Sequence, residues 1–371
     1  MMNRCTNCVL PAQTPNIAFD EDGVCNYCDT YRPVSYRGEA AFVAALDRFR
    51  GMGDEYDCLV PISGGRDSSY VLLRLVKDFN MRALAVNYKN PFTVPQAITN
   101  IENASRSLGV KVVNFRNGDR NHRITFRQTV EAWLKRPSPA TIPIVCIGCK
   151  PAWWHIYRTA RRFHIPLIVS GGNPYEVISF KRELVGISRD EAADKAFFKY
   201  VYALRKLLQN RAFLRPRLLA TLARSYLMGN PNSLGIRLIG RKITWLELFN
   251  YVPWDEATVL QRIMTELDWD YPRKLQSSWR FDCRVKHMVD LMYLSTMQMT
   301  DKDDFYAKLV REGRMSRETA VSQLAQQNKP YVAEIDILLR QAGFDDRSLV
   351  DGMLAKTAVE IMNSEQFNNE L

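Results

Sequence analysis

A serine- and glycine-rich segment, placed between a short apolar stretch and an amphipathic one, restricts the fold of this chain more than any other feature. Residues 56–62 (YDCLVPI) predict a buried strand, and residues 68–79 (SSYVLLRLVKDF) have the apolar spacing of a helix. Gly64 and Gly65 carry no Cβ, so the backbone between these elements can approach an anion closely. The N–H groups at the start of a helix also point toward negative charge. We therefore expect a phosphate-binding loop made of Ser63, Gly64, Gly65, Arg66, Asp67, Ser68 and Ser69.

Polar side chains add to what this loop can bind. Ser63, Ser68 and Ser69 supply hydroxyl donors. Asp67 lies in the first helical turn, where it can brace the loop or meet a phosphate-bound Mg²⁺. The segment matches neither GxxxxGKS/T nor GxGxxG, so it is neither a Walker A loop nor a dinucleotide-binding fingerprint.

Strand-like and helical stretches continue to alternate after the loop. The pattern predicts strands at 82–88, 111–115 and 166–170, a helix at 95–108, another ending near residue 136, and one at 151–163. Such alternation is typical of an α/β fold in which helices cover both faces of a parallel sheet. From about residue 255 onward the sequence is nearly all helical in pattern.

Residues 190–245 interrupt this alternation with a helical, basic and aromatic stretch. Two interpretations are open for it: an element that docks on a partner or a membrane surface, or a helical hairpin packed on the core, which we favour. Pro216 is expected to break or kink this stretch. We divide the chain into a Cys₄ module (1–33), a nucleotide-binding core (34–185), a basic helical insertion (186–250), and remaining core elements with C-terminal helices (251–371).

Six of the eight cysteines lie in CxxC pairs. The pairs that begin at Cys5 and Cys25 have the spacing of a tetrahedral zinc site, whose four thiolates leave no position open for chemistry. Residues 1–33 have too few large apolar side chains for a core, so zinc binding would supply their folding free energy. We expect a structural zinc ion held by Cys5, Cys8, Cys25 and Cys28.

The third pair, Cys146 and Cys149, is incomplete as a metal site and needs further ligands such as the distant Cys283. Two interpretations are open. In the first, these three cysteines form a second metal site. In the second, Cys283 is a buried core residue, and the pair is either a small zinc knuckle or two free thiols. Cys58, inside the first strand, is expected in the core.

The net charge of +11 favours anionic partners, such as nucleotides, nucleotide sugars, nucleic acid or an acidic membrane face. No stretch approaches the roughly 20 apolar residues that span a bilayer. The first residues have no apolar signal-peptide core, so we expect a cytoplasmic protein.

With its SGGxDS loop between a strand and a helix, the chain resembles the PP-loop ATP pyrophosphatase superfamily, whose fold is that of adenine nucleotide alpha hydrolases. The resemblance implies that ATP is cleaved between its α- and β-phosphates and that a substrate is adenylated. It places Val86 and Asn87 near the adenine, and Gly171, Gly172 and Asn173 in a second nucleotide-facing motif. For that motif the alternative is a plain turn capped by Asn173.

Several longer strings are more specific. The strings are CTNCVLPAQTPNIAFDEDGVCNYC, PISGGRDSSY, PIVCIGCK and SGGNPYE. Together they resemble the N-acetyl sugar amidotransferases of bacterial O-antigen and lipopolysaccharide synthesis. That family implies adenylation of the N-acetyl group of a nucleotide-activated sugar, with Ser63, Asp67 and Ser68 as catalytic residues. Ammonia would come from a separate class I glutaminase and give an acetamidino sugar. The chain itself shows no nucleophile-elbow cysteine followed by His-x-Glu.

Two other interpretations remain. The chain also resembles PP-loop enzymes that thiolate tRNA, which implies a [4Fe–4S] cluster or a catalytic disulfide at Cys146, Cys149 and Cys283, and a nucleic-acid partner. A non-catalytic scaffold of a polysaccharide pathway is the third. An enzyme with anionic substrates needs positive charge near its site, and the candidates are Arg66, Lys150, Lys181 and Arg280. Residues of these types are, however, more often solvated on the surface than part of a binding site.

Overall fold

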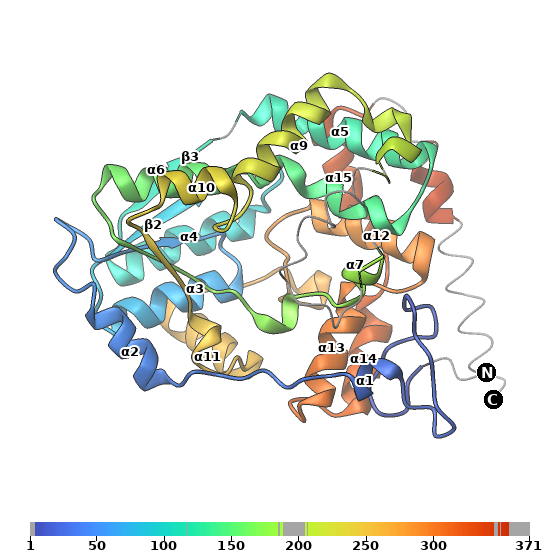
Figure 1. Cartoon of the computed structure of the whole chain (residues 1–371), viewed down its shortest axis with the longest axis horizontal. Helices are drawn as coiled ribbons and strands as arrows, with labels where there is room; N and C mark the ends of the chain where they lie inside the picture. The colour runs from blue at the N-terminus through green and yellow to red at the C-terminus, as the bar shows by residue number, and fades with distance from the viewer. Residues whose placement is uncertain are drawn as a thin grey trace.

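The computed structural model describes residues 4–116, 118–184, 186–187, 205, 207–344, 348 and 350–355. A single sheet of five parallel strands, in the order β3-β2-β1-β4-β5, occupies one end of the elongated molecule (Figure 1). The strands are β1 Cys58–Pro61, β2 Ala83–Tyr88, β3 Val112–Phe115, β4 Leu167–Ser170 and β5 Thr244–Glu247. The α/β class with a parallel sheet is thereby confirmed.

Both faces of the sheet are covered, as the alternation along β1 shows. Cys58 and Val60 belong to one buried cluster and Leu59 to another, because successive side chains of a strand point to opposite faces. Helix α3 (Arg66–Leu73), which continues as a π-helix over Arg74–Asp78, packs with α4 (Pro95–Leu108) and α11 (Glu256–Leu267) on the first face. Helix α6 (Ala152–Arg162), which packs against β2 and α10 (Leu234–Ile239), contributes Ile156 to the cluster on the second face.

Strand β5 corrects the expectation that residues 190–245 are all helical. It pairs with β4 from Leu167 opposite Thr244 to Ser170 opposite Glu247. Its residues are exposed or only half-buried, and only Trp245 and Leu246 among its four residues are apolar. The other edge strand, β3, is half-buried too, but three of its four residues are apolar, so it was found from the sequence. Pro216 does not break a helix either: it is the first residue of α9 (Pro216–Met228), a position where its missing N–H costs nothing.

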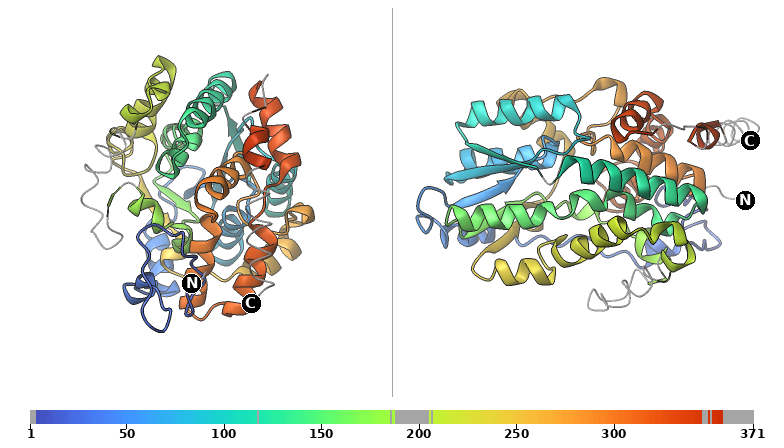
Figure 2. Two further views of the ribbon diagram at one scale, coloured as in Figure 1. Left: turned by 90° about the vertical axis from the view of Figure 1, so that its right-hand side faces the viewer. Right: turned by 90° about the horizontal axis from the view of Figure 1, so that it is seen from above.

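The C-terminal region is helical, as expected. It contributes α11 Glu256–Leu267, α12 Val285–Met297, α13 Asp301–Arg311, α14 Arg317–Gln327 and α15 Val332–Ala342. Among the described residues, the remaining helices of eight residues or more are α2 Glu39–Asp47, α4 Pro95–Leu108, α5 Asp119–Lys135 and the 3₁₀ segment η2 Pro139–Cys149. Helices α5 and α12 pack on η2 beyond the sheet, and α15 packs on both of these helices. The N-terminal segment with the short helix α1 (Asn26–Asp29) lies beside α13 and α14 (Figures 1 and 2).

The connection order creates a switch point beside β1. From β1 the chain proceeds to β2 and β3 on one side, whereas β4 and β5 lie on the other side of β1. In open parallel sheets, ligands bind outside the carboxyl ends of the strands at such a switch point. The serine- and glycine-rich loop follows β1, and Gly171 and Gly172 follow β4, so both motifs meet at this edge.

Candidate functional site

The backbone of the loop after β1 depends on Gly64. Its φ is +81°, and a Cβ built there would lie 2.0 Å from the carbonyl oxygen of Ala97. The carbonyl of Gly64 accepts hydrogen bonds from Trp269 Nε1 (2.9 Å) and Asn100 Nδ2 (3.0 Å). A glycine is therefore required here, and the loop is clamped between α4 and the segment after α11.

Hydroxyl groups line the inside of the loop. The N–H of Ser63 donates to Ser68 Oγ at 3.2 Å, and the N–H of Gly65 donates to Ser63 Oγ at 3.3 Å. The two hydroxyls lie 3.3 Å apart, and Ser69 Oγ donates to the carbonyl of Gly65. These N–H contacts are long for hydrogen bonds, so a phosphate oxygen could replace them with shorter, charge-assisted ones.

Arg66 does not present its charge to solvent. Its side chain is 3% exposed, donates to Glu256 Oε1 at 2.5 Å and stacks on the ring of Trp254 at 4.6 Å. Burial lowers the pKa of the guanidinium, but the carboxylates of Asp67 and Glu256 outweigh that effect and raise it. Arg66 therefore remains charged and ties the loop to α11 through its side chain.

Asp67 joins the two motifs at the edge of the sheet. Its Oδ1 accepts from Trp254 Nε1 at 3.0 Å, and its Oδ2 lies 3.4 Å from Asn173 Nδ2. A Cβ on Gly171 would be 3.1 Å from the carbonyl oxygen of Asp67, so the turn after β4 packs directly against the start of α3.

Asn173 serves as a cap and as part of this edge. Its Oδ1 accepts from the N–H of Tyr175 at 3.0 Å at the start of a short 3₁₀ turn, Pro174–Glu176. The plain-turn interpretation thus describes its local role, while its amide also contacts Asp67. At the end of the turn, Glu176 accepts from Trp279 Nε1 at 2.6 Å, and burial raises its pKa.

Val86 and Asn87 lie at the carboxyl end of β2, as expected, but offer little surface. Val86 is buried, and Asn87 donates to Asn114 Oδ1 on β3 at 2.9 Å. Their side chains serve the sheet, so an adenine beside them would contact chiefly backbone.

Two carboxylates that lie at the site, Asp282 and Glu247, were not identified from the sequence. Asp282 comes from the loop before α12, and its Cγ would lie 3.6 Å from a Cβ on Gly65. Burial raises its pKa, while a hydrogen bond from the Ser63 hydroxyl opposes that rise and the nearby Asp67 adds to it. Glu247, at the carboxyl end of β5, would contact a Cβ on Gly172 at 2.0 Å. The only signal for Asp282 was its place between Arg280 and Cys283 in the sequence.

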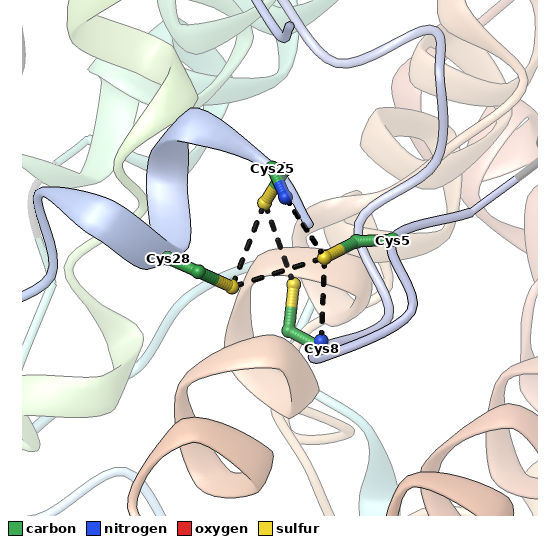
Figure 3. A group of neighbouring side chains, drawn as sticks. All are labelled: Cys5, Cys8, Cys25 and Cys28. Carbon is green, nitrogen blue, oxygen red and sulfur yellow. Dashed lines mark hydrogen bonds between the residues drawn. The ribbon is translucent and has the colours of Figure 1, made fainter. Parts of the chain in front are cut away.

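The four N-terminal cysteines assemble as predicted (Figure 3). Their sulfur atoms lie 3.8 Å apart for Cys5 and Cys28, 3.8 Å for Cys8 and Cys25, and 3.6 Å for Cys25 and Cys28. A tetrahedron with metal–sulfur bonds of about 2.3 Å has edges of about 3.8 Å, so the set fits a tetrahedral zinc ion.

A cation completes this cluster. Arg311 donates from Nη2 to Cys8 Sγ at 3.2 Å and from Nε to Cys28 Sγ at 3.3 Å. Arg317 donates to the carbonyl oxygens of Cys5 and Cys8 at 2.9–3.1 Å. Four thiolates around Zn²⁺ carry a net charge of −2, which the guanidinium of Arg311 partly offsets. The module therefore docks on α13 and α14 through charge as well as packing.

The residue after Arg311 connects the cysteine module to the site. Glu312 accepts from the hydroxyls of Tyr31 and Tyr175 at 2.6 Å each and from the N–H of Val34 at 2.8 Å. Tyr175 stands in the turn between Asn173 and Glu176. A chain of contacts thus runs from the thiolates to the residues beside the phosphate loop.

The other three cysteines are not drawn together into a ligand set. Within the part of the chain that the structure describes, only the N-terminal group has three or more ligand atoms within 4.8 Å of one another. Cys149 Sγ donates to the carbonyl of Cys146 at 3.1 Å, and Asn90 Nδ2 donates to Cys283 Sγ at 3.3 Å. Burial raises the pKa of all three thiols, for Cys149 to about 12. Because η2 packs on α12, which begins two residues after Cys283, the three share one neighbourhood.

The remaining cationic candidates differ in their surroundings. Lys181 pairs with the buried Asp301 at 2.8 Å, and Lys150 is exposed. Arg280 is 46% exposed and lies 3.6 Å from Glu176, with a left-handed φ of 51°. Only Arg280 combines exposure with proximity to the loop residues.

Comparisons with known proteins give distant fold matches. No protein-family model and no curated protein sequence matches the chain. Among solved structures, the NMN synthetase from Francisella tularensis aligns with a TM-score of 0.38 at 10% identity, over 83% of this chain and 95% of that one. The U34-tRNA thiolase NcsA from Methanococcus maripaludis, with its [4Fe–4S] cluster, aligns with a TM-score of 0.34 at 11% identity, over 91% and 89%. Similarity at this level transfers no function.

Replacing Arg66 by alanine should destabilise the fold, because Glu256 and Glu176 would lose a buried partner. We expect the free energy of unfolding to fall by about 3 kcal/mol. Arg50→Ala is the matched control: its pair with Asp47 is exposed and should cost less than about 1 kcal/mol. Equal denaturant midpoints for the two variants would contradict the role given to Arg66.

The purified protein should contain one zinc ion per chain, measured by atomic absorption. Cys25→Ser should abolish that content and lower the melting temperature, since the N-terminal segment loses its staple. Cys58→Ser, inside β1, should keep the zinc. A Cys25→Ser protein with full metal content would exclude the proposed ligand set.

The effect of Glu312→Gln on the stability of the protein should depend on pH, because Glu312 links the cysteine module to the site. The hydrogen bonds from both tyrosines outweigh burial and hold the pKa of Glu312 below its ordinary value of 4.5. Its stabilising contribution is therefore present above that pH and lost as the pH falls through the lower folded value. We expect the stability difference between wild type and Glu312→Gln to shrink on acidification; a difference that is constant from pH 7 to pH 3 would refute this.

Proposed function

We propose that this protein is an ATP-dependent enzyme of the PP-loop type, which binds the β- and γ-phosphates at the loop after β1 and transfers AMP to an oxygen of a second substrate. The observation that carries the proposal is the loop itself. Its glycine-dependent backbone and facing hydroxyls lie at the switch point between β1 and β4, where the turn at Gly171 packs directly against the start of α3. A cradle of N–H and hydroxyl donors at a helix N-terminus favours phosphate.

Two carboxylates beside an anion cradle would repel phosphate unless a cation lies between. Asp67 and Asp282 flank the loop, and oxygen ligands of this kind suit Mg²⁺. These residues would hold the Mg²⁺ that accompanies ATP, and the ion would neutralise charge on the leaving pyrophosphate. Asp282 is the addition that the structure makes to the residues expected from the sequence.

For the second substrate we propose the N-acetyl group of a nucleotide-activated sugar. The amide oxygen would attack the α-phosphorus, and the bond to the β-phosphate would break with release of pyrophosphate. Ammonia would then add to the activated carbon, and AMP would leave with the oxygen, so that an acetamidino group remains. The support is the resemblance of the cysteine-bearing and loop strings, together with the half-exposed Arg280 near the loop as a partner for the sugar's phosphates.

Ammonia would be delivered by a class I glutaminase subunit, because the sequence shows no glutaminase motif of its own. A tRNA-thiolating activity is the second candidate. The neighbourhood shared by Cys146, Cys149 and Cys283 favours it, since three thiolates can hold an iron–sulfur cluster and leave one iron open.

Single substitutions in the loop should abolish adenylation. We expect Ser63→Ala and Asp67→Asn to reduce the release of AMP and pyrophosphate by at least about 100-fold. Asp282→Asn should weaken Mg²⁺-dependent ATP binding, measured by calorimetry. The exposed Ser322→Ala serves as the control. Normal turnover in folded Ser63→Ala and Asp67→Asn would refute the assignment.

One assay distinguishes the two candidate substrates, a nucleotide-activated sugar and tRNA. AMP release is followed with ammonia and a panel of UDP- and CMP-linked N-acetyl sugars, and in parallel with unmodified tRNA. Stimulation by a sugar but not by tRNA supports the amidotransferase. Stimulation by tRNA alone, with an anaerobic absorbance typical of iron–sulfur clusters, would establish the second candidate instead.

A further inference from the structure

The outer surface of α9 and α10 (Leu234–Ile239) is unusually apolar for a face that nothing covers in the described structure. The described part of the chain contains eleven exposed large apolar side chains, and seven of them lie between residues 208 and 238. Leu208 and Leu214 precede α9 in the chain. The other five, Leu219, Tyr226, Leu227, Leu234 and Leu238, lie on the two helices and define what we call the α9–α10 surface.

Helix α9 is apolar on its outer side as well as on its inner side. Leu218 is buried, and so are Thr221 and Ser225, whose hydroxyls donate to the carbonyls of Arg217 and Ile147 at 2.9 Å each. Leu219, Tyr226 and Leu227 face solvent. Surface helices normally place the apolar stripe inward. In α9, hydroxyl side chains occupy two of the inner positions, and three large apolar side chains are left outside.

Helix α10 continues this surface. Leu234 and Leu238 are one helical turn apart and 63% and 56% exposed, while Ile236 between them is buried. The two helices contact each other and lie outside α5 and α6 along one long side of the molecule (Figure 2). The exposed leucines are therefore distributed along a strip rather than gathered in a pocket.

The same strip is exclusively cationic. The sequence has eleven lysines and arginines and no aspartate or glutamate between Asp194 and Glu247. Arg217 and Arg224 are exposed on α9, and Arg237 is exposed on α10. A second copy of the chain would bring a surface of the same sign against this one, which disfavours self-association through it.

We propose that the α9–α10 surface binds an anionic membrane surface. Leucines would enter the boundary between headgroups and acyl chains, and the arginines beside them would contact lipid phosphates, as in interfacial helices. In the described residues no helix is long and apolar enough to cross a bilayer, so the contact is peripheral. The inference stands on this surface alone and does not depend on the proposed reaction.

Vesicle sedimentation tests the proposal with the full chain. The test uses vesicles of phosphatidylcholine with roughly 30% phosphatidylglycerol, which are anionic, and vesicles of pure phosphatidylcholine. We expect the protein to bind the anionic vesicles at least about 10-fold more tightly, and this binding should weaken as the salt concentration rises. One variant changes Leu219, Leu227, Leu234 and Leu238 to Gln, and it should bind the anionic vesicles at least about 10-fold more weakly than wild type. A second variant combines Arg217→Gln, Arg224→Gln and Arg237→Gln, and it should lose binding to the same extent.

The matched control is Met52→Gln with Val332→Gln, which removes two exposed apolar side chains elsewhere and should bind vesicles like wild type. Thermal melts establish that each variant is folded. Equal binding to both vesicle types, no binding, or undiminished binding by the leucine variant would overturn the proposal. A dimer in size-exclusion chromatography that only the leucine variant loses would assign the surface to a second copy instead.

Discussion

The buried guanidinium of Arg66 determines how the two halves of this molecule fit together. It follows the two glycines of the loop in sequence, yet its short ion pair with Glu256 and its stacking partner Trp254 lie at and just before the start of α11. A charge that is 3% exposed is stable only where carboxylates and hydrogen-bond acceptors surround it. The C-terminal helices must therefore be docked before the loop can adopt its shape. The loop is thus a product of the whole fold, although its residues are contiguous.

The cysteine module acts on the same edge from the opposite side. Arg311 holds the thiolates, and the next residue, Glu312, holds the hydroxyl of Tyr175 in the turn that carries Asn173. Folding of residues 4–33 and the shape of the second motif are therefore coupled through one turn of α13. Such coupling would let a metal ion held by the four cysteines influence a site that it does not touch.

Local features of the sequence predicted local structure well. The strand–loop–helix unit and the cluster of Cys5, Cys8, Cys25 and Cys28 depend on short sequence motifs whose chemistry is apparent, and the structure contains both. Strand β5 was missed because only Trp245 and Leu246 among its four residues are apolar. The burial of Arg66 and the position of Asp282 could not be predicted, because both depend on contacts with residues far along the chain. The same holds for Cys283, whose approach to η2 follows from the packing of α12.

The central claim is that the backbone after β1 is a cradle for the β- and γ-phosphates of ATP. A crystal structure of the protein with Mg²⁺ and a non-cleavable α,β-methylene analogue of ATP tests it most directly. We predict phosphate oxygens within hydrogen-bonding distance of the N–H groups of Ser63 and Gly65, with the metal between the phosphates and the carboxylates of Asp67 and Asp282. Phosphates bound elsewhere, with the hydroxyls of Ser63 and Ser68 still in contact with each other, would contradict the account.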